Sequence, residues 1–121
     1  MGVDRESGAI AIGALLRKGQ LVQFHLRDKK MSAEDLDVML TRYLSQGQAE
    51  NASGALLFSC LGRGKYLYGE ANHDTNMFRN KLGEIPVGGF FCNGEIGPVG
   101  NTTFLHGYTS SFGIFRKSNQ T

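Results

Sequence analysis

A short apolar run near the middle of the chain limits the fold more than any other feature. Residues 54–60 read Gly-Ala-Leu-Leu-Phe-Ser-Cys, and only the serine carries a polar side chain. A continuous apolar run of this length is typical of a strand that is buried on both faces. We therefore expect residues 54–60 to lie inside a central sheet that other elements cover.

The clearest predicted element is a helix over residues 32–46. Ser32 followed by Asp35 is a variant of the capping box that begins many helices. Apolar side chains then repeat at the helical spacing i, i+3, i+4, i+7, i+8. These side chains are Leu36, Met39, Leu40, Tyr43 and Leu44. We expect the helix to pack on the sheet through this stripe.

The remaining elements follow from similar patterns along the chain. Residues 9–16 and 21–27 are separated by Lys18-Gly19 and predict a β-hairpin. A second helix is expected from near His73 to Leu82, capped by Asn72 or Asp74. Strands are expected at residues 87–92 and 103–116, the latter with a bulge near Gly107. The order ββαβαββ predicts an α+β fold with a central, mostly antiparallel sheet and two helices, in a single domain over residues 1–116. Residues 117–121 form a polar tail that we expect to fray.

Charge and composition argue against several classes of function. The net charge is +2 and no Lys/Arg cluster with interleaved aromatic residues occurs, so we expect no nucleic-acid partner. The apolar runs are too short to span a bilayer, so we expect no membrane association. The first residues contain no apolar signal core, which favours a cytoplasmic protein. There the two cysteines should be reduced, and their spacing predicts no metal site.

Polar residues follow two of the predicted strands and indicate a ligand site. We expect the loop at residues 60–64 and the loop at residues 92–97 to meet at one end of the sheet, with His106 beside them. The chain has 17 glycines, which concentrate at the ends of apolar runs. Arg63 lies between Gly62 and Gly64, and its guanidinium group suits a carboxylate or a phosphate. Glu95 follows the strand at residues 87–92 and would suit an ammonium group. An amino-acid-like ligand would satisfy both, although the two side chains could equally pair with each other or solvate a turn.

Three further residues leave other chemistry open. Cys60, Cys92 and His106 could form a nucleophilic Cys–His pair, which would need a hydrogen-bond contact and a lowered thiol pKa. The sequence 62–65, Gly-Arg-Gly-Lys, matches neither a dinucleotide-binding nor a Walker A spacing.

Long stretches of the chain resemble the FIST C-terminal domain family. The first is residues 54–64, Gly-Ala-Leu-Leu-Phe-Ser-Cys-Leu-Gly-Arg-Gly, and the second is residues 85–98, Ile-Pro-Val-Gly-Gly-Phe-Phe-Cys-Asn-Gly-Glu-Ile-Gly-Pro. Residues 104–111, Phe-Leu-His-Gly-Tyr-Thr-Ser-Ser, complete the set, and residues 23–28 resemble the family's entry strand. The family's name joins F-box proteins with intracellular signal transduction.

The resemblance implies a sensory domain rather than an enzyme. It implies a small-ligand-binding module of a bacterial-type signal-transduction protein, with amino acids or related carboxylates as ligands and without a cofactor. The implied protein partner is a FIST N-terminal domain or a signalling domain in a longer protein. The implied pocket positions are Cys60, Arg63, Cys92, Asn93, Glu95 and His106. The alternatives are an enzyme that uses a Cys/His nucleophilic site, and a purely structural or interaction domain.

Overall fold

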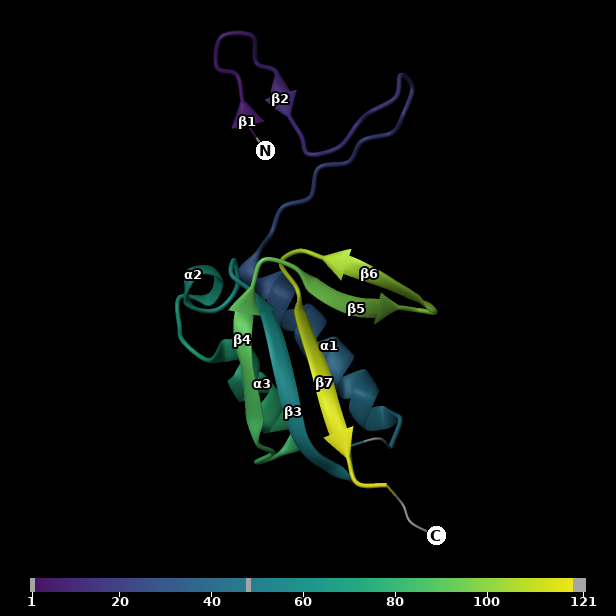
Figure 1. Ribbon diagram of the computed structural model, residues 1–121. Coiled ribbons are helices and arrows are strands. Elements are labelled where there is room, and N and C mark those ends of the chain that lie inside the picture. The colour runs from purple at the N-terminus through teal and green to yellow at the C-terminus, as the bar shows by residue number, and fades with distance from the viewer. Residues whose placement is uncertain (1, 48, 119–121) are drawn as a thin grey trace.

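The computed structural model describes residues 2–47 and 49–118. Two helices lie behind a small sheet, and an N-terminal segment extends away from this body (Figure 1). The helices are α1 (Lys29–Ser45), α2 (Lys65–Tyr68) and α3 (His73–Leu82). The strands are β1 (Gly2–Val3), β2 (Ile10–Ala11), β3 (Ala52–Cys60), β4 (Val87–Cys92), β5 (Glu95–Val99), β6 (Thr102–His106) and β7 (Ser110–Arg116). The predicted α+β class and the approximate order ββαβαββ are confirmed.

The central sheet has three strands in the order β4-β3-β7. Strand β3 is parallel to β4, so that Cys60 is opposite Cys92, and antiparallel to β7. The pairs β1–β2 and β5–β6 form separate two-stranded antiparallel ribbons. The β5–β6 ribbon lies across the end of the sheet at which β3 and β4 finish (Figure 1). The apolar run at residues 54–60 therefore does form the middle strand.

The core lies between the sheet and helices α1 and α3. Its buried members are Leu36 and Leu40 from α1, Ala55 from β3 and Phe78 from α3. The ring of Phe78 stacks on Phe112 of β7, with centroids 5.0 Å apart. The predicted packing of the first helix on the sheet is thus correct for Leu36 and Leu40. Met39 of the predicted stripe is 58% exposed.

Helix α1 begins three residues before the predicted start at Ser32. The side chain of Asp28 caps the helix by accepting a hydrogen bond from the backbone N–H of Met31. A carboxylate at this position satisfies one of the unpaired N–H groups of the first turn. The capping box proposed at Ser32 therefore lies within the first turns of the helix.

The predicted hairpin of residues 9–16 and 21–27 is wrong. Only Ile10–Ala11 of the first segment is a strand, and it pairs with Gly2–Val3. Residues 21–27 form no strand, and Leu21 and Leu26 are 92% and 98% exposed. Alternating apolar residues stabilise a strand only where one face is buried, and residues 21–27 bury neither face against the described body.

The predicted strand over residues 103–116 is two strands. The chain turns at residues 107–109, where Tyr108 adopts a positive φ of 62°. Strand β6 pairs with β5, whereas β7 pairs with β3. Strand β5 itself lies in a segment that was expected to be a loop. Lys117 of the predicted tail donates a backbone hydrogen bond to Asn51, and residues 119–121 lie outside the described part.

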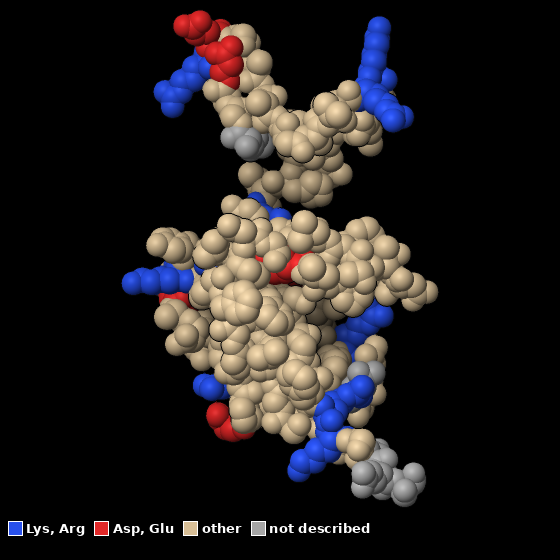
Figure 2. All heavy atoms as spheres, viewed as in Figure 1, with Lys and Arg blue, Asp and Glu red and all other residues tan. Residues whose placement is uncertain are grey.

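One face of the central sheet is not covered by a helix. Leu56, Phe90 and Phe115 on this face are 38%, 62% and 57% exposed. Figure 2 shows few charged residues over this face, with Lys and Arg side chains mainly at its margins. The expectation that residues 54–60 are buried on both faces is therefore wrong for the face that carries Leu56.

Candidate functional site

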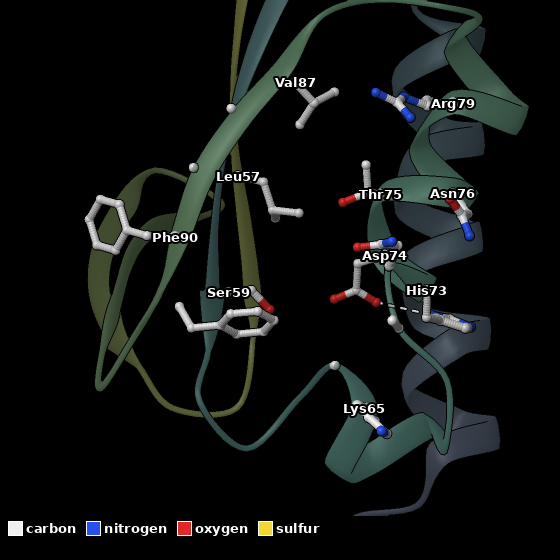
Figure 3. Close-up of a pocket in the computed structure, with 16 residues that line it drawn as sticks. Leu57, Ser59, Lys65, His73, Asp74, Thr75, Asn76, Arg79, Val87 and Phe90 are labelled. Carbon is white, nitrogen blue, oxygen red and sulfur yellow. Dashed lines mark hydrogen bonds and ion pairs between the residues drawn. The ribbon is translucent and has the colours of Figure 1, made fainter.

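A cavity of about 540 Å³ lies on the helix-covered side of the sheet, between β3 and β4 on one side and α2 and α3 on the other. Leu57 and Val87 from the strands form an apolar wall (Figure 3). Phe91 of β4 also lines the cavity. The opposite wall is polar and comes from the first turns of α3. A pocket with an apolar wall and a few fixed polar groups is the usual form of a small-molecule site.

Asp74, in the first turn of α3, is the best-anchored side chain of the polar wall. Its Oδ2 accepts hydrogen bonds from Nε of Arg63 at 2.8 Å and from Oγ of Ser110 at 2.6 Å. Its Oδ1 lies 3.2 Å from Nη2 of Arg63 and 3.0 Å from Nδ1 of His73. Burial alone would raise the pKa of Asp74, but the hydrogen bonds from Arg63, Ser110 and His73 lower it below its usual value. The carboxylate is therefore ionised and fixed in place.

Arg63 reaches Asp74 from the loop that follows β3. Its guanidinium group also donates to the carbonyl oxygen of Tyr108 at 3.3 Å and to the hydroxyl of Tyr68. Burial alone would lower the pKa of Arg63, but the pairing with Asp74 raises it overall. The pair links the β3 loop, α3 and the β6–β7 turn behind the polar wall.

Helix α2 closes one end of the cavity. Gly64 precedes it with a φ of 65°, and a Cβ atom there would lie 2.8 Å from the ring of Phe91. Glycine is therefore required at this position both for the backbone conformation and for the close approach. Tyr68 of α2 stacks on His73, with ring centroids 3.6 Å apart. Burial and the nearby Asp74 carboxylate raise the pKa of the Tyr68 hydroxyl, so Tyr68 is neutral.

Two exposed cations stand near opposite ends of the cavity, and Asp74 lies between them (Figure 3). These are Lys65 of α2 and Arg79 of α3. Ser59, Thr75 and Asn76 add uncharged polar groups. Because Arg63 already neutralises Asp74, the two cations leave the cavity with a net positive charge. The arrangement suits a small anionic ligand with an apolar portion.

None of the six residues predicted from sequence lines this cavity. The two strand-end loops adjoin, because the N–H of Leu61 donates to the carbonyl of Cys92 at 2.9 Å. Arg63 stands behind Asp74, and Cys60 is buried at the end of β3. Asn93 is exposed just after the end of the neighbouring strand β4. The structure thus brings the loops together, while the cavity opens on the other side of the strands.

Arg63 and Glu95 do not pair with each other. Glu95 is 1% exposed, and its Oε2 accepts hydrogen bonds from the backbone N–H and the hydroxyl of Thr109 at 3.2 and 2.9 Å. Its Oε1 lies 3.5 Å from the Cys92 sulfur. Burial and this contact raise the pKa of the Cys92 thiol. Both predicted ligand-binding charges therefore have partners inside the protein.

The Cys–His contact that a nucleophilic pair needs is not formed. The Nε2 atom of His106 lies 2.9 Å from the carbonyl oxygen of Gly97. The Cys92 thiol instead contacts Glu95 and the carbonyl oxygen of Ser59. Within residues 2–47 and 49–118, no group of three or more metal-ligating side chains is close enough to hold an ion. In the same ranges, no helix is long and apolar enough to cross a membrane.

Sequence analysis missed the residues that line the cavity. Asp74 was assigned only a possible capping role, because its partner Arg63 lies 11 positions earlier with α2 between them. Two signals were present in the sequence. Residues 72–76 form a polar run at a helix start, and Ser59 is a polar residue inside an apolar strand. Both face the same cavity in the structure.

Comparison with known proteins places the chain in a family. The model of the FIST C domain matches residues 1–98. An uncharacterised protein of Mycobacterium tuberculosis is 40% identical over 115 residues, covering 95% of this chain and 30% of its own length. An F-box/LRR-repeat protein of Arabidopsis thaliana is 30% identical over 115 residues, covering 83% of this chain and 22% of its own. F-box only protein 22 of Homo sapiens is 26% identical over 92 residues, covering 75% and 23%.

The chain thus spans less than a third of each of these relatives. The family match ends before β6 and β7, although β7 is hydrogen-bonded along the central strand β3. The match over residues 1–98 and the 40% identity over most of the chain agree with the motifs at residues 54–64 and 85–98. The chain belongs to the FIST C domain family.

Proposed function

We propose that this chain is a small-ligand-binding sensory domain of an intracellular signal-transduction protein, and that its ligand is a small carboxylate, amino acids included. The observation that carries the proposal is the cavity of about 540 Å³ with an apolar wall, a fixed polar wall and two exposed cations. The family membership supports the signalling role, since the family's name refers to signal transduction.

The charges of the cavity favour an anion over a cation. Both oxygens of Asp74 already receive hydrogen bonds from Arg63, Ser110 and His73. A ligand ammonium group would have to compete with these donors. Lys65 and Arg79 are exposed, and neither is part of an ion pair in the described residues. A carboxylate would bind at the end of the cavity where Arg79 offers a guanidinium donor.

The apolar wall defines the rest of the ligand. Leu57 and Val87 line this wall with aliphatic carbon, and Phe91 adds an aromatic ring. The hydroxyl of Thr75 and the amide of Asn76 on the facing wall could accept from an α-amino group. An amino acid with an aliphatic side chain would therefore satisfy both walls.

In this proposal Arg63 is a positioning residue, because it holds Asp74 and the start of α3. The other predicted site residues lie on the far side of the same strand ends. They are Cys60, Cys92, Asn93, Glu95 and His106. We propose that they contribute to the site where a further segment, such as a FIST N-terminal domain or a signalling domain, covers them in a longer protein.

The test is a thermal-shift panel of amino acids and small organic acids on the wild-type chain and two variants. A bound carboxylate at a hundred times its Kd should stabilise the folded state by about 2.7 kcal/mol. Arg79→Ala should abolish the shift. Arg42→Ala, which changes an exposed arginine on α1, is the matched control and should retain it. The proposal fails if no carboxylate raises the melting temperature of the wild type, or if Arg79→Ala responds like Arg42→Ala.

A further inference from the structure

The two cysteines of the chain occupy paired positions on neighbouring strands. Cys60 is the last residue of β3 and Cys92 is the last residue of β4. The parallel register places them directly opposite each other. Paired residues of a sheet project to the same face, so the two thiols share the face opposite the ligand cavity.

The spacing of paired strands is compatible with a covalent link. Neighbouring strands lie about 4.7–4.9 Å apart. The Cα atoms of disulfide-bonded cysteines are usually about 4.4–6.8 Å apart. Both cysteines are free thiols in this structure.

The surroundings give the two thiols different accessibility. Cys60 is 7% exposed, whereas Cys92 is only partly buried. The Cys92 thiol contacts two oxygens, the backbone carbonyl of Ser59 at 3.6 Å and Oε1 of the buried Glu95 at 3.5 Å. The Ser59 contact shows that the Cys92 sulfur lies close to the backbone of β3, one residue before Cys60.

We propose that Cys60 and Cys92 are an oxidisable pair that forms a reversible disulfide when the protein meets a peroxide. The raised pKa leaves only a minor fraction of Cys92 as thiolate. This thiolate attacks one peroxide oxygen, the O–O bond breaks, and the departing oxygen leaves as water after protonation. Cys92 is then a sulfenic acid. The Cys60 thiolate attacks its sulfur, the S–O bond breaks, and the second oxygen leaves as water. Two thiols are oxidised, one peroxide is reduced, and both thiol protons end in water.

Oxidation would also change the environment of Glu95. The Cys92 S–H group is the donor nearest to Oε1 of this buried carboxylate, and a disulfide has no S–H. Glu95 then keeps only the two hydrogen bonds of Thr109 on Oε2. Glu95 is the first residue of β5, and Thr109 precedes β7. Oxidation of the pair would therefore change the hydrogen bonding at the start of the β5–β6 ribbon.

The test is peptide mapping after treatment of the folded wild-type chain with hydrogen peroxide. The remaining thiols are alkylated, the protein is digested without reductant, and linked peptides are sought by mass spectrometry. We expect one intramolecular link between the peptides that contain Cys60 and Cys92, a monomeric band on a non-reducing gel, and full recovery of two thiols after dithiothreitol.

Two serine variants separate the roles of the cysteines. Cys60→Ser should accumulate a sulfenic acid on Cys92 that dimedone traps, whereas Cys92→Ser should leave Cys60 largely unreacted at the same peroxide dose. Arg79→Ala, which alters the proposed ligand cavity, should oxidise like the wild type, so this result is independent of the proposed function. The inference is overturned if peroxide leaves both wild-type thiols alkylatable, or yields only over-oxidised cysteine or intermolecular dimers.

Discussion

Arg63 joins three parts of the molecule through a single guanidinium group. It donates to Asp74 of α3, to Tyr68 of α2 and to the backbone of Tyr108 between β6 and β7. Arg63 and Asp74 are each 6% exposed. A buried pair of this kind is costly to break, because removing one partner leaves the other as an uncompensated charge.

Replacing Arg63 with alanine should therefore destabilise the fold itself. We expect Arg63→Ala to lower the free energy of unfolding by about 3–5 kcal/mol, since Asp74 would remain buried without its main partner. Urea denaturation measures this directly. Arg17→Ala, an exposed arginine of the N-terminal segment, is the control and should change stability by less than about 0.5 kcal/mol. A loss below about 1 kcal/mol for Arg63→Ala would contradict the structural role.

Asp74 should make stability depend on pH at the acid end. Burial alone would raise its pKa, but hydrogen bonds from Arg63, Ser110 and His73 lower the pKa below its usual value in the folded state. Its contribution to stability is therefore complete above the unfolded pKa of about 3.9 and is lost as the pH falls through the folded value. Asp74→Asn should be less stable at neutral pH and lose less stability between about pH 5 and pH 2 than the wild type. Asp35→Asn, an exposed change on α1, should follow the wild-type curve.

Helix α1 offers a matched pair of residues for testing the core. Leu40 is 4% exposed, while its neighbour Met39 is 58% exposed. Leu40→Ala should cost about 2–5 kcal/mol because it leaves a cavity between α1 and the sheet. Met39→Ala should cost less than about 1 kcal/mol, as expected for a surface position. Chemical denaturation of both variants measures the difference, and equal losses would show that the helix faces are assigned incorrectly.

Some elements could be predicted because their signals are local. The helix His73–Leu82 and the strand Val87–Cys92 have clear ends, Gly83 after the helix and the turn residues Asn93-Gly94 after the strand. The start of α1 was misplaced because Asp28 and Ser32 are both good capping residues, and sequence alone does not rank them.

Other elements could not be predicted because their outcome depends on distant partners. Residues 21–27 alternate like a strand, yet nothing in the described body buries them. Residues 103–116 read as one strand, but their two halves pair with different strands. At the site, the loops at Arg63 and Glu95 were predicted to adjoin, but the partners of both charges were not. Asp74 comes within hydrogen-bond distance of Arg63, and Thr109 of Glu95, only when the chain is folded.

At the scale of the whole molecule, the N-terminal segment is the part with the least secondary structure and burial. Residues 12–27 contain no helix or strand, and Leu15, Leu21 and Leu26 are each more than 90% exposed. The segment is anchored near its end by Arg27, which donates to the carbonyl oxygens of Gly107 and Tyr108 and covers the ring of Tyr108.

Limited proteolysis should therefore act first on this segment. Exposed backbone without secondary structure is the preferred substrate of a protease. Chymotrypsin at low concentration should cut among residues 15–26 and leave a resistant fragment that begins near Asp28, which mass spectrometry would identify. The same digestion of Arg27→Ala should yield the fragment faster. Initial cleavage inside β3 or α3 would contradict this order of stability.

The position of β3 between β4 and β7 has a consequence for how the protein comes to be folded. Strand β4 follows β3 after one helical hairpin, whereas β7 is the last strand of the described chain. During synthesis, the edge of β3 that pairs with β7 therefore stays unpaired until residue 116 has left the ribosome. Pairing over such a long stretch is slow, and an open strand edge can meanwhile pair with another chain. Nascent chains that stall before residue 110 should consequently be the form of this protein that most needs a chaperone.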